Sequence, residues 1–142
     1  MKTKFFKVTM LMLVAIFTIS CSKDDESSST ESSSNSTSTT TTWVKLTAIT
    51  SSGVVKPNYI IMMFDQPITS TTALPEIKKQ VTTDANGLVY FDLNTMITST
   101  TPTKYYFEAF VQNSTGYTWK SVSHYSVDLK KGTMTTSSII VN

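Results

Sequence analysis

The sequence contains no arginine, one cysteine and one histidine, and each shortage argues against a class of site. Arginine is the side chain best suited to bidentate recognition of phosphate, so its absence argues against nucleic-acid binding. Cys21 has no second cysteine with which to form a disulfide within the chain. His124 and Cys21 are the only histidine and thiol in the sequence, too few of these ligands to build a zinc site. We therefore expect no metal, no cofactor and no nucleic-acid partner.

The first twenty residues are basic and then apolar. Residues 1–7 carry three of the twelve lysines, and residues 8–19 (VTMLMLVAIFTI) form an apolar run that ends at Ser20, directly before Cys21. This run is shorter than the roughly 20 apolar residues that a membrane-spanning helix needs. A basic start, a short apolar run and a small residue are typical of a secretory signal peptide. We predict that residues 1–20 are removed, which leaves nine lysines against ten acidic residues.

The pair Ser20-Cys21 resembles the site at which bacterial lipoprotein signal peptidase cuts its substrates. The resemblance implies that Cys21 becomes the first residue of the mature chain and bears acyl chains such as palmitate. Two or more acyl chains give stable anchoring to a membrane. The next residues also resemble the start of Gram-negative lipoproteins that are exported to the cell surface, with an export signal at Ser22, Lys23, Asp24, Asp25 and Glu26. These resemblances imply an outer-membrane lipoprotein that faces the cell surface.

Residues 21–42 are acidic and then almost entirely serine and threonine. The part at 27–42 (SSSTESSSNSTSTTTT) has no apolar residue, so it cannot bury enough surface to offset the entropy of ordering. We predict a disordered tether. As a flexible coil, it would reach about 20 to 25 Å, and roughly 55 Å when fully extended.

Residues 43–142 are the part of the chain that can bury a core. About 100 residues suffice for one domain. Short β-rich runs alternate with turn residues, and no long window has a helical period. We predict an all-β domain, a single seven-stranded antiparallel sandwich, with strands at 43–50, 59–65, 77–82, 88–93, 104–112, 117–129 and 133–141.

Two turns and two strands stand out within this domain. Residues 84–87 (DANG) predict a hairpin, because asparagine and glycine tolerate positive φ angles. Residues 113–116 (NSTG) predict a second reversal. Apolar and polar residues alternate in 88–93, which predicts one buried face, whereas 60–64 (IIMMF) is apolar throughout and predicts a central strand covered on both sides.

The segment 83–87 (TDANG), followed by 91–93 (FDL), resembles a stretch of transthyretin-like sandwiches. That group includes carboxypeptidase regulatory-like domains and the B-type repeats of collagen adhesins. Residues 106–108 (YFE) and 116–118 (GYT) are similar to a strand and a turn of the same repeats. The resemblance covers residues 54–118 and implies a transthyretin-like, Ig-like fold, which by itself does not fix a function.

The same resemblance implies one covalent feature. B-type repeats can form an amide bond between a lysine on the first strand and an asparagine at the end of the last, promoted by a central acid. Lys45, Asn142 and Glu108 stand at comparable positions in this sequence. The alternative is that Lys45 points to water and the chain end frays.

Catalytic patterns are weak. His124 with Asp128 and a distant serine would make a triad, but no nucleophile-elbow motif singles out one serine. Glycoside hydrolysis needs two acids across one bond, and turn and surface roles suffice for the acids of the domain. We predict no catalytic residues, and we interpret His124 as a surface residue on a strand.

The aromatic residues are the remaining indication of function. Exposed tyrosines and tryptophans form platforms for sugar rings or patches for protein partners. We predict a non-enzymatic binding or structural module for another envelope protein. A carbohydrate-binding module is the first alternative, favoured if Trp119, Tyr117 and a neighbouring tyrosine share one exposed face. A small hydrolase, with acids gathered around His124, is the second.

Overall fold

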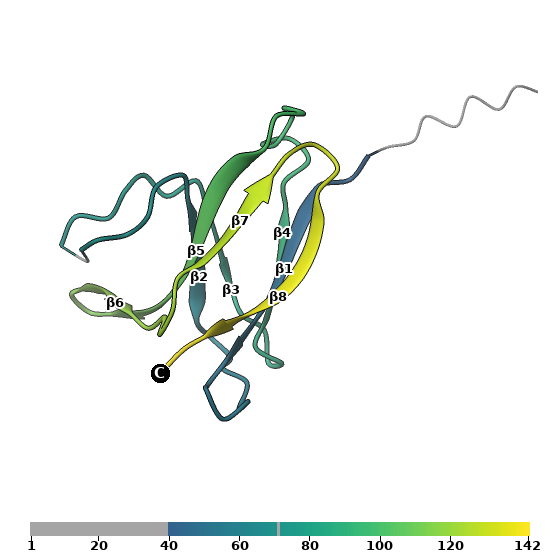
Figure 1. Ribbon diagram of the computed structural model, residues 1–142. Helices are drawn as coiled ribbons and strands as arrows, with labels where there is room; N and C mark the ends of the chain where they lie inside the picture. The colour runs from purple at the N-terminus through teal and green to yellow at the C-terminus, as the bar shows by residue number, and fades with distance from the viewer. Residues whose placement is uncertain (1–39, 71) are drawn as a thin grey trace, which may run out of the picture. The chain divides into compact units, whose positions relative to one another are not determined.

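The computed structural model describes residues 40–70 and 72–142, which form an all-β sandwich of two sheets (Figure 1). The predicted signal peptide, Cys21, the export signal at 22–26 and nearly all of the tether lie outside the described residues. The strands of the described part are β1 (Trp43–Ile49), β2 (Ile60–Phe64), β3 (Lys79–Thr82), β4 (Leu88–Asp92), β5 (Thr103–Asn113), β6 (Gly116–Trp119), β7 (Tyr125–Leu129) and β8 (Met134–Ile140).

We call the two layers sheet A and sheet B. Sheet A has three strands in the order β4-β1-β8, and sheet B has five, in which β3-β2-β5-β6 lie in order and β7 also pairs with β5. The predicted antiparallel arrangement holds for every described strand pair except β1–β8, which is parallel. The first and last strands of the domain run in the same direction because the chain changes sheets between them.

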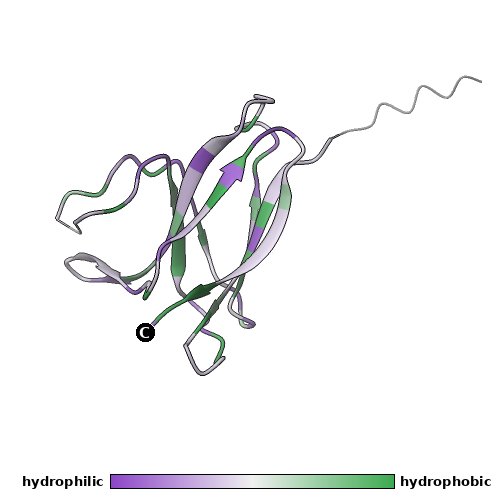
Figure 2. Ribbon diagram, in the orientation of Figure 1, coloured by the Kyte–Doolittle hydropathy of each residue, from purple (hydrophilic) through white to green (hydrophobic). Residues whose placement is uncertain are grey.

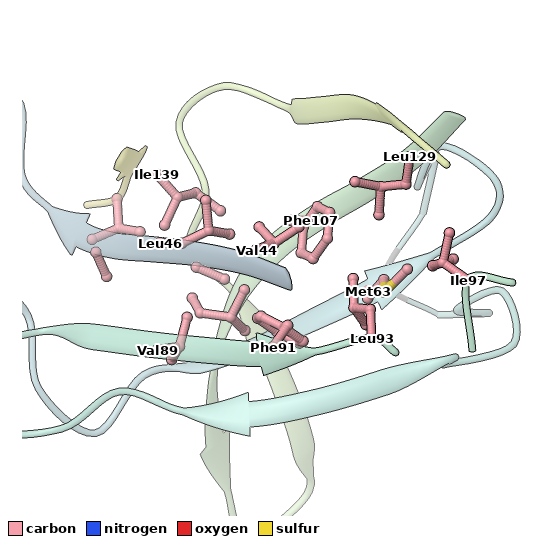
Figure 3. Close-up of a cluster of buried hydrophobic side chains, with 14 residues drawn as sticks. Val44, Leu46, Met63, Val89, Phe91, Leu93, Ile97, Phe107, Leu129 and Ile139 are labelled. Carbon is pink, nitrogen blue, oxygen red and sulfur yellow. The ribbon is translucent and has the colours of Figure 1, made fainter. Parts of the chain in front are cut away.

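The main core lies between the sheets (Figure 3). Alternation in β1 sends Val44, Leu46 and Ala48 inward, as expected for a strand with one buried face. Phe91 of β4 meets Phe107 of β5 edge to face, with ring centroids 5.2 Å apart. The buried face predicted for 88–93 is confirmed, because Val89, Phe91 and Leu93 are all buried.

The turn at 84–87 forms, but it does not make a hairpin. Gly87 N donates to Asp84 O at 2.9 Å, and the Asp84 carboxylate accepts from the backbone N of Asn86 and of Leu88. The strands on either side belong to different sheets, β3 to sheet B and β4 to sheet A. Gly87 O accepts from Ala48 N at 2.7 Å, which directs the chain onto β1. The hairpin prediction was wrong because the motif fixes a reversal of the chain and not the strand that comes next to it.

The predicted strand at 117–129 is broken into β6 and β7, so the described residues hold eight strands instead of seven. Both parts lie antiparallel to β5. The pairs Phe110–Trp119 and Phe107–Tyr125 are three residues apart along β5 but six residues apart along the segment that holds β6 and β7. The extra residues leave the sheet and interrupt the strand. The reversal predicted at 113–116 is confirmed as the tight connection between β5 and β6.

The folded part begins before the predicted boundary at Trp43. Thr42, assigned to the tether from the sequence, is buried. Its backbone N donates to Asn94 Oδ1 at 2.7 Å, its carbonyl accepts from Leu93 N, and its hydroxyl accepts from Gly132 N. The backbone and hydroxyl of Thr42 are therefore tied to the sandwich before β1 begins.

Candidate functional site

The outer face of sheet B carries a buried glutamate. In β5, Phe107 and Ala109 point into the main core, so Glu108 between them points to the opposite face of the sheet. Its exposed fraction is 0%. An ionised carboxylate removed from water costs several kcal/mol unless it is paired and hydrogen-bonded. What surrounds Glu108 therefore decides whether the fold tolerates it.

The chain opposite Glu108 crosses from one sheet to the other. We call residues 120–124 the crossing segment. At its start, Lys120 N donates to Ala109 O at 2.8 Å on sheet B. Two residues later, Val122 N donates to Ile140 O at 2.8 Å, beside the end of β8 in sheet A. The Ser121 hydroxyl accepts from Ala109 N at 2.7 Å, which replaces a backbone partner lost at the break.

Glu108 joins the last residue of β6 to the last residue of the crossing segment. Its Oε2 accepts from Trp119 Nε1 at 2.9 Å, and its Oε1 lies 2.6 Å from His124 Nδ1. The rings of Trp119 and His124 also lie against each other, with centroids 5.3 Å apart. Each carboxylate oxygen thus has a side-chain partner, and every buried side-chain N or O atom in the described residues is hydrogen-bonded. This cluster holds the break between β6 and β7 in place.

The arrangement around Glu108 matches neither the hypothetical triad nor a metal site. The contact at Nδ1 orients the imidazole of His124, whose side chain is 53% exposed. Asp128, the acid of the hypothetical triad, instead pairs with Lys104 at 3.2 Å. Among residues 40–70 and 72–142, no group of three or more histidine, cysteine or acidic side chains is placed to hold a metal ion. His124 is exposed as predicted, but it precedes β7 instead of lying on a strand.

The residues of the predicted amide crosslink are not brought together. Lys45 lies on the outer face of sheet A, opposite Tyr90 and Thr136 in register. Glu108 lies on the outer face of sheet B, so the main core separates the two. Asn142 is held by its backbone, whose N donates to Lys120 O and whose carbonyl accepts from Tyr59 Oη at 2.9 Å.

The outer face of sheet B is covered. A second apolar cluster surrounds Phe110, with Phe64 and Tyr117 edge-on to its ring at 6.4 and 6.2 Å. The connection between β2 and β3 folds over this cluster and contributes Ile68 and Leu74. It explains why β2, which is apolar along its length in Figure 2, is buried on both faces as predicted. Tyr117 and Trp119 are partly buried against the cluster, so they do not form the shared exposed face that would favour the carbohydrate-binding alternative.

A lysine closes the covering connection. Lys78 Nζ contacts Glu76 at 2.7 Å and Asp65 at 2.9 Å, and its backbone N donates to Met63 O. The hydrogen bonds to Glu76 and then to Asp65 raise the pKa of Lys78 above its ordinary value. The two ends of the connection are thereby joined beside β2, which keeps Ile68 and Leu74 over the sheet.

The outer face of sheet A is bare by comparison. The rings of Trp43 on β1 and Tyr90 on β4 lie 5.8 Å apart. Tyr90 is 50% exposed, and Met134 on β8, which pairs with Trp43, is 59% exposed. Lys45 lies between the two edge strands. Large apolar side chains therefore remain open to water on this face.

The sequence contains a pattern that indicates a buried, paired glutamate, but from the sequence Glu108 was predicted only as the acid of a possible crosslink. Glu108 is the one charged residue within the apolar run 105–111 (YYFEAFV), and a charge in a buried strand needs a partner. That partner had to be a histidine, lysine or other donor on a neighbouring segment. Nothing in the spacing identified His124, because its approach depends on the break after β6.

Comparisons with family models, with curated proteins and with solved structures each found no match. In the part of the chain that the structure describes, no helix has the length and apolarity needed to cross a membrane. The basis for a function is therefore the chemistry of the two outer faces and of the residues before the sandwich.

Proposed function

We propose that the chain is the precursor of a surface-exposed outer-membrane lipoprotein, anchored through Cys21, whose sandwich is a non-enzymatic binding module for another envelope protein. The anchor is supported by the signal layout of residues 1–20 and by the acidic start at 22–26. Acyl chains on Cys21 would hold the mature chain at the membrane without a spanning segment. The tether would then separate the sandwich from the lipid.

The bare outer face of sheet A is the observation that carries the binding role. Tryptophan, tyrosine and methionine are enriched at the centres of protein interfaces, and Trp43, Tyr90 and Met134 lie together here. The face is built on paired strands, so little conformational entropy is lost when a partner binds. On sheet B, the equivalent apolar surface is used within the chain.

We also propose that the sandwich belongs to the transthyretin-like type. The supporting residues are those of the 83–93 stretch. Asp84 closes the turn through its own carboxylate, and Phe91 and Leu93 are buried on either side of exposed Asp92. A turn of this kind requires the acid and the glycine at their observed spacing.

The anchor is tested by intact mass spectrometry of the mature protein from its native membrane, combined with protease treatment of whole cells. We expect a chain that starts at Cys21 and bears acyl groups, and a sandwich that protease releases from intact cells. An unmodified chain would overturn the anchor. A chain that is cut only in broken cells would place it on the inner side.

The binding face is tested by placing a photo-crosslinking residue at Tyr90 in the native cell. Gln80 is the matched control, because it is also exposed but lies on sheet B. We expect one dominant protein adduct at position 90 and none at position 80. Equal labelling at both positions, or no adduct at 90, would contradict the proposal.

A carbohydrate-binding module is the second candidate, and the Trp43–Tyr90 ring pair favours it. Aromatic rings on a sheet, with Lys45 and Thr47 beside them, match the apolar faces and hydroxyls of sugars. Retention on insoluble surface glycans that is lost in Tyr90→Ala, without a protein adduct at position 90, would favour this function over the first.

A further inference from the structure

The free edge of β8 is a second exposed feature of sheet A. Thr133 O accepts from Trp43 N, and Val141 N donates to Ile49 O, so odd-numbered residues of this strand bond to β1. The N–H and C=O of one strand residue point to the same side. The backbone groups of Met134, Thr136 and Ser138 therefore point away from β1. No strand of the described residues pairs with them there, and all three residues are exposed.

The chain itself begins a strand along this edge. In the crossing segment, Val122 N donates to Ile140 O, and Asn142 N donates to Lys120 O, which is antiparallel pairing. Ser121 and Val141 form the bridge between these bonds. After Val122 the chain turns away to sheet B and joins β7. A strand that continued from Val122 along β8 would lie beside Met134–Ser138, but no strand of the described residues occupies that position.

The open part of β8 lacks the features that usually protect an edge. Natural edge strands carry charges, prolines or bulges that discourage further pairing. Residues 134–138 (MTTSS) contain no charge and no proline, and Figure 2 shows this part of β8 as pale, neither strongly polar nor apolar. Exposed apolar side chains stand at both ends, Val122 at 60% and Met134 at 59%. The edge is thus suited to accept an extended segment.

The charged residues near β8 indicate which charges the added segment would carry. Lys130 and Lys131 precede β8 on an ordered turn, in which Lys130 N donates to Thr133 Oγ1 and Lys131 N donates to Ser99 O. Neither lysine has a carboxylate partner among the described residues. The six acids there are all engaged in ion pairs or side-chain hydrogen bonds, as at Asp65, Glu76, Asp84, Asp92, Glu108 and Asp128. Two unpaired positive charges therefore mark this end of the edge, against one, Lys120, beside its other end.

We propose that β8 is a strand-addition site, which takes an extended segment of the partner protein antiparallel to residues 134–138, with acidic residues at the segment's C-terminal end. An antiparallel segment that continues the line of residues 120–122 ends beside Lys130 and Lys131, which fixes where its charges lie. Backbone hydrogen bonds supply affinity in this mode of recognition. The inference rests on the proposed binding function and names how the partner is held.

The test uses the full chain with Cys21→Ser, so that no lipid is added, and two labelled, amidated peptides. The first alternates threonine and valine and ends in two aspartates, and the second has the aspartates at its start. In the free chain, hydrogen exchange at the amides of Thr136 and Ser138 should be fast, and at Thr135 and Ser137 slow. The first peptide should slow exchange at 136 and 138 and bind about tenfold more tightly than the second, as two added ion pairs allow.

Two variants separate strand addition from simple charge attraction. Thr136→Pro removes an outward N–H while sparing the bonds to β1, as an edge strand tolerates, and should abolish protection at Ser138. Lys130→Glu with Lys131→Glu should reverse the preference between the peptides without altering the edge. Lys56→Glu, in the connection between β1 and β2, is the charge control and should change neither.

Several outcomes would overturn the inference. Binding without slowed exchange at 136 and 138 would mean attraction to the lysines alone, and equal binding of the two peptides would remove the assigned direction. Slow exchange at both amides in the free chain, lost on dilution, would mean that a second copy occupies the edge. If a protein adduct forms at position 90 in spite of any of these results, only the strand-addition inference fails. If no adduct forms at position 90, the proposed binding function itself fails.

Discussion

The two outer faces of the sandwich differ although both arise from the same alternation of side chains. On sheet B, the β2–β3 connection and Trp119 cover an apolar surface, and a buried Glu108 has both oxygens paired. On sheet A, Trp43, Tyr90 and Met134 face water. An apolar outer face is stable when the chain returns to cover it, and the proposed function assigns the uncovered one to a partner. Mutations on sheet B should therefore affect stability, and mutations on sheet A should affect binding.

The largest effect is expected from Phe110→Ala on the covered face. Phe110 is fully buried between Phe64 and Tyr117. Truncating a packed phenylalanine removes transfer energy and leaves a cavity, which costs about 3 to 5 kcal/mol. Urea unfolding of the variant and the parent chain measures the difference. A loss below about 1 kcal/mol would mean that the second cluster is a loose surface patch, and the contrast between the faces would fail.

The next largest effect is expected from His124→Ala. This change leaves Glu108 buried with Trp119 as its remaining side-chain donor. A buried oxygen left without its partner costs the desolvation penalty of its group, and we expect a loss of about 3 kcal/mol in the free energy of unfolding. Ser123→Ala, in the same exposed segment, is the control and should stay within about 0.5 kcal/mol. Equal unfolding midpoints for the two variants would show that the cluster does not hold the break.

A smaller effect is expected at the turn that links the two sheets. Gly87 has a φ of +70°, and a Cβ there would lie 2.8 Å from Ala48 O and 3.0 Å from Lys56 N. Gly53 has a similar φ of +83° with open space around it. Gly53→Ala should cost about 1 kcal/mol for the left-handed backbone alone, and Gly87→Ala about 2 kcal/mol or more. Thermal unfolding compares them, and equal losses would contradict the close approach of β1 to this turn.

The sequence was sufficient for features set by neighbouring residues. Alternation at 88–93 identified the buried face, the apolar run at 60–64 identified a strand covered on both sides, and the turn residues at 113–116 identified a reversal. Each depends on side chains a few positions apart. Local chemistry of this kind is the same whichever sheet the strand joins.

Features that depend on which segments meet could not be obtained this way. The DANG turn fixed a reversal but not that β4 would pair with β1 in the other sheet. Residues 117–129 have continuous β character, and the break appears because residues 120–122 find partners beside Ile140 and Val141. The cluster of Glu108 with His124 follows from that break. Long-range pairing therefore produced the candidate site, and a single sequence does not specify it.

The smallest effect on stability is expected from Tyr90→Ala on the bare face, where it would sharpen the comparison most. Tyr90 is half exposed and contacts Trp43, and an aromatic pair contributes about 0.5 to 1.5 kcal/mol beyond its buried area. We expect a loss of about 1 kcal/mol in urea unfolding, because water already reaches the ring.

In the cell, the same variant with a photo-crosslinking residue at Thr47 should lose most of the partner adduct obtained there with Tyr90 present. Phe110→Leu, a milder change on the covered face, should keep that adduct despite a comparable or greater loss of stability. If both variants lost the adduct equally, stability alone would explain the defect, and the outer face of sheet A would no longer be distinguished from that of sheet B.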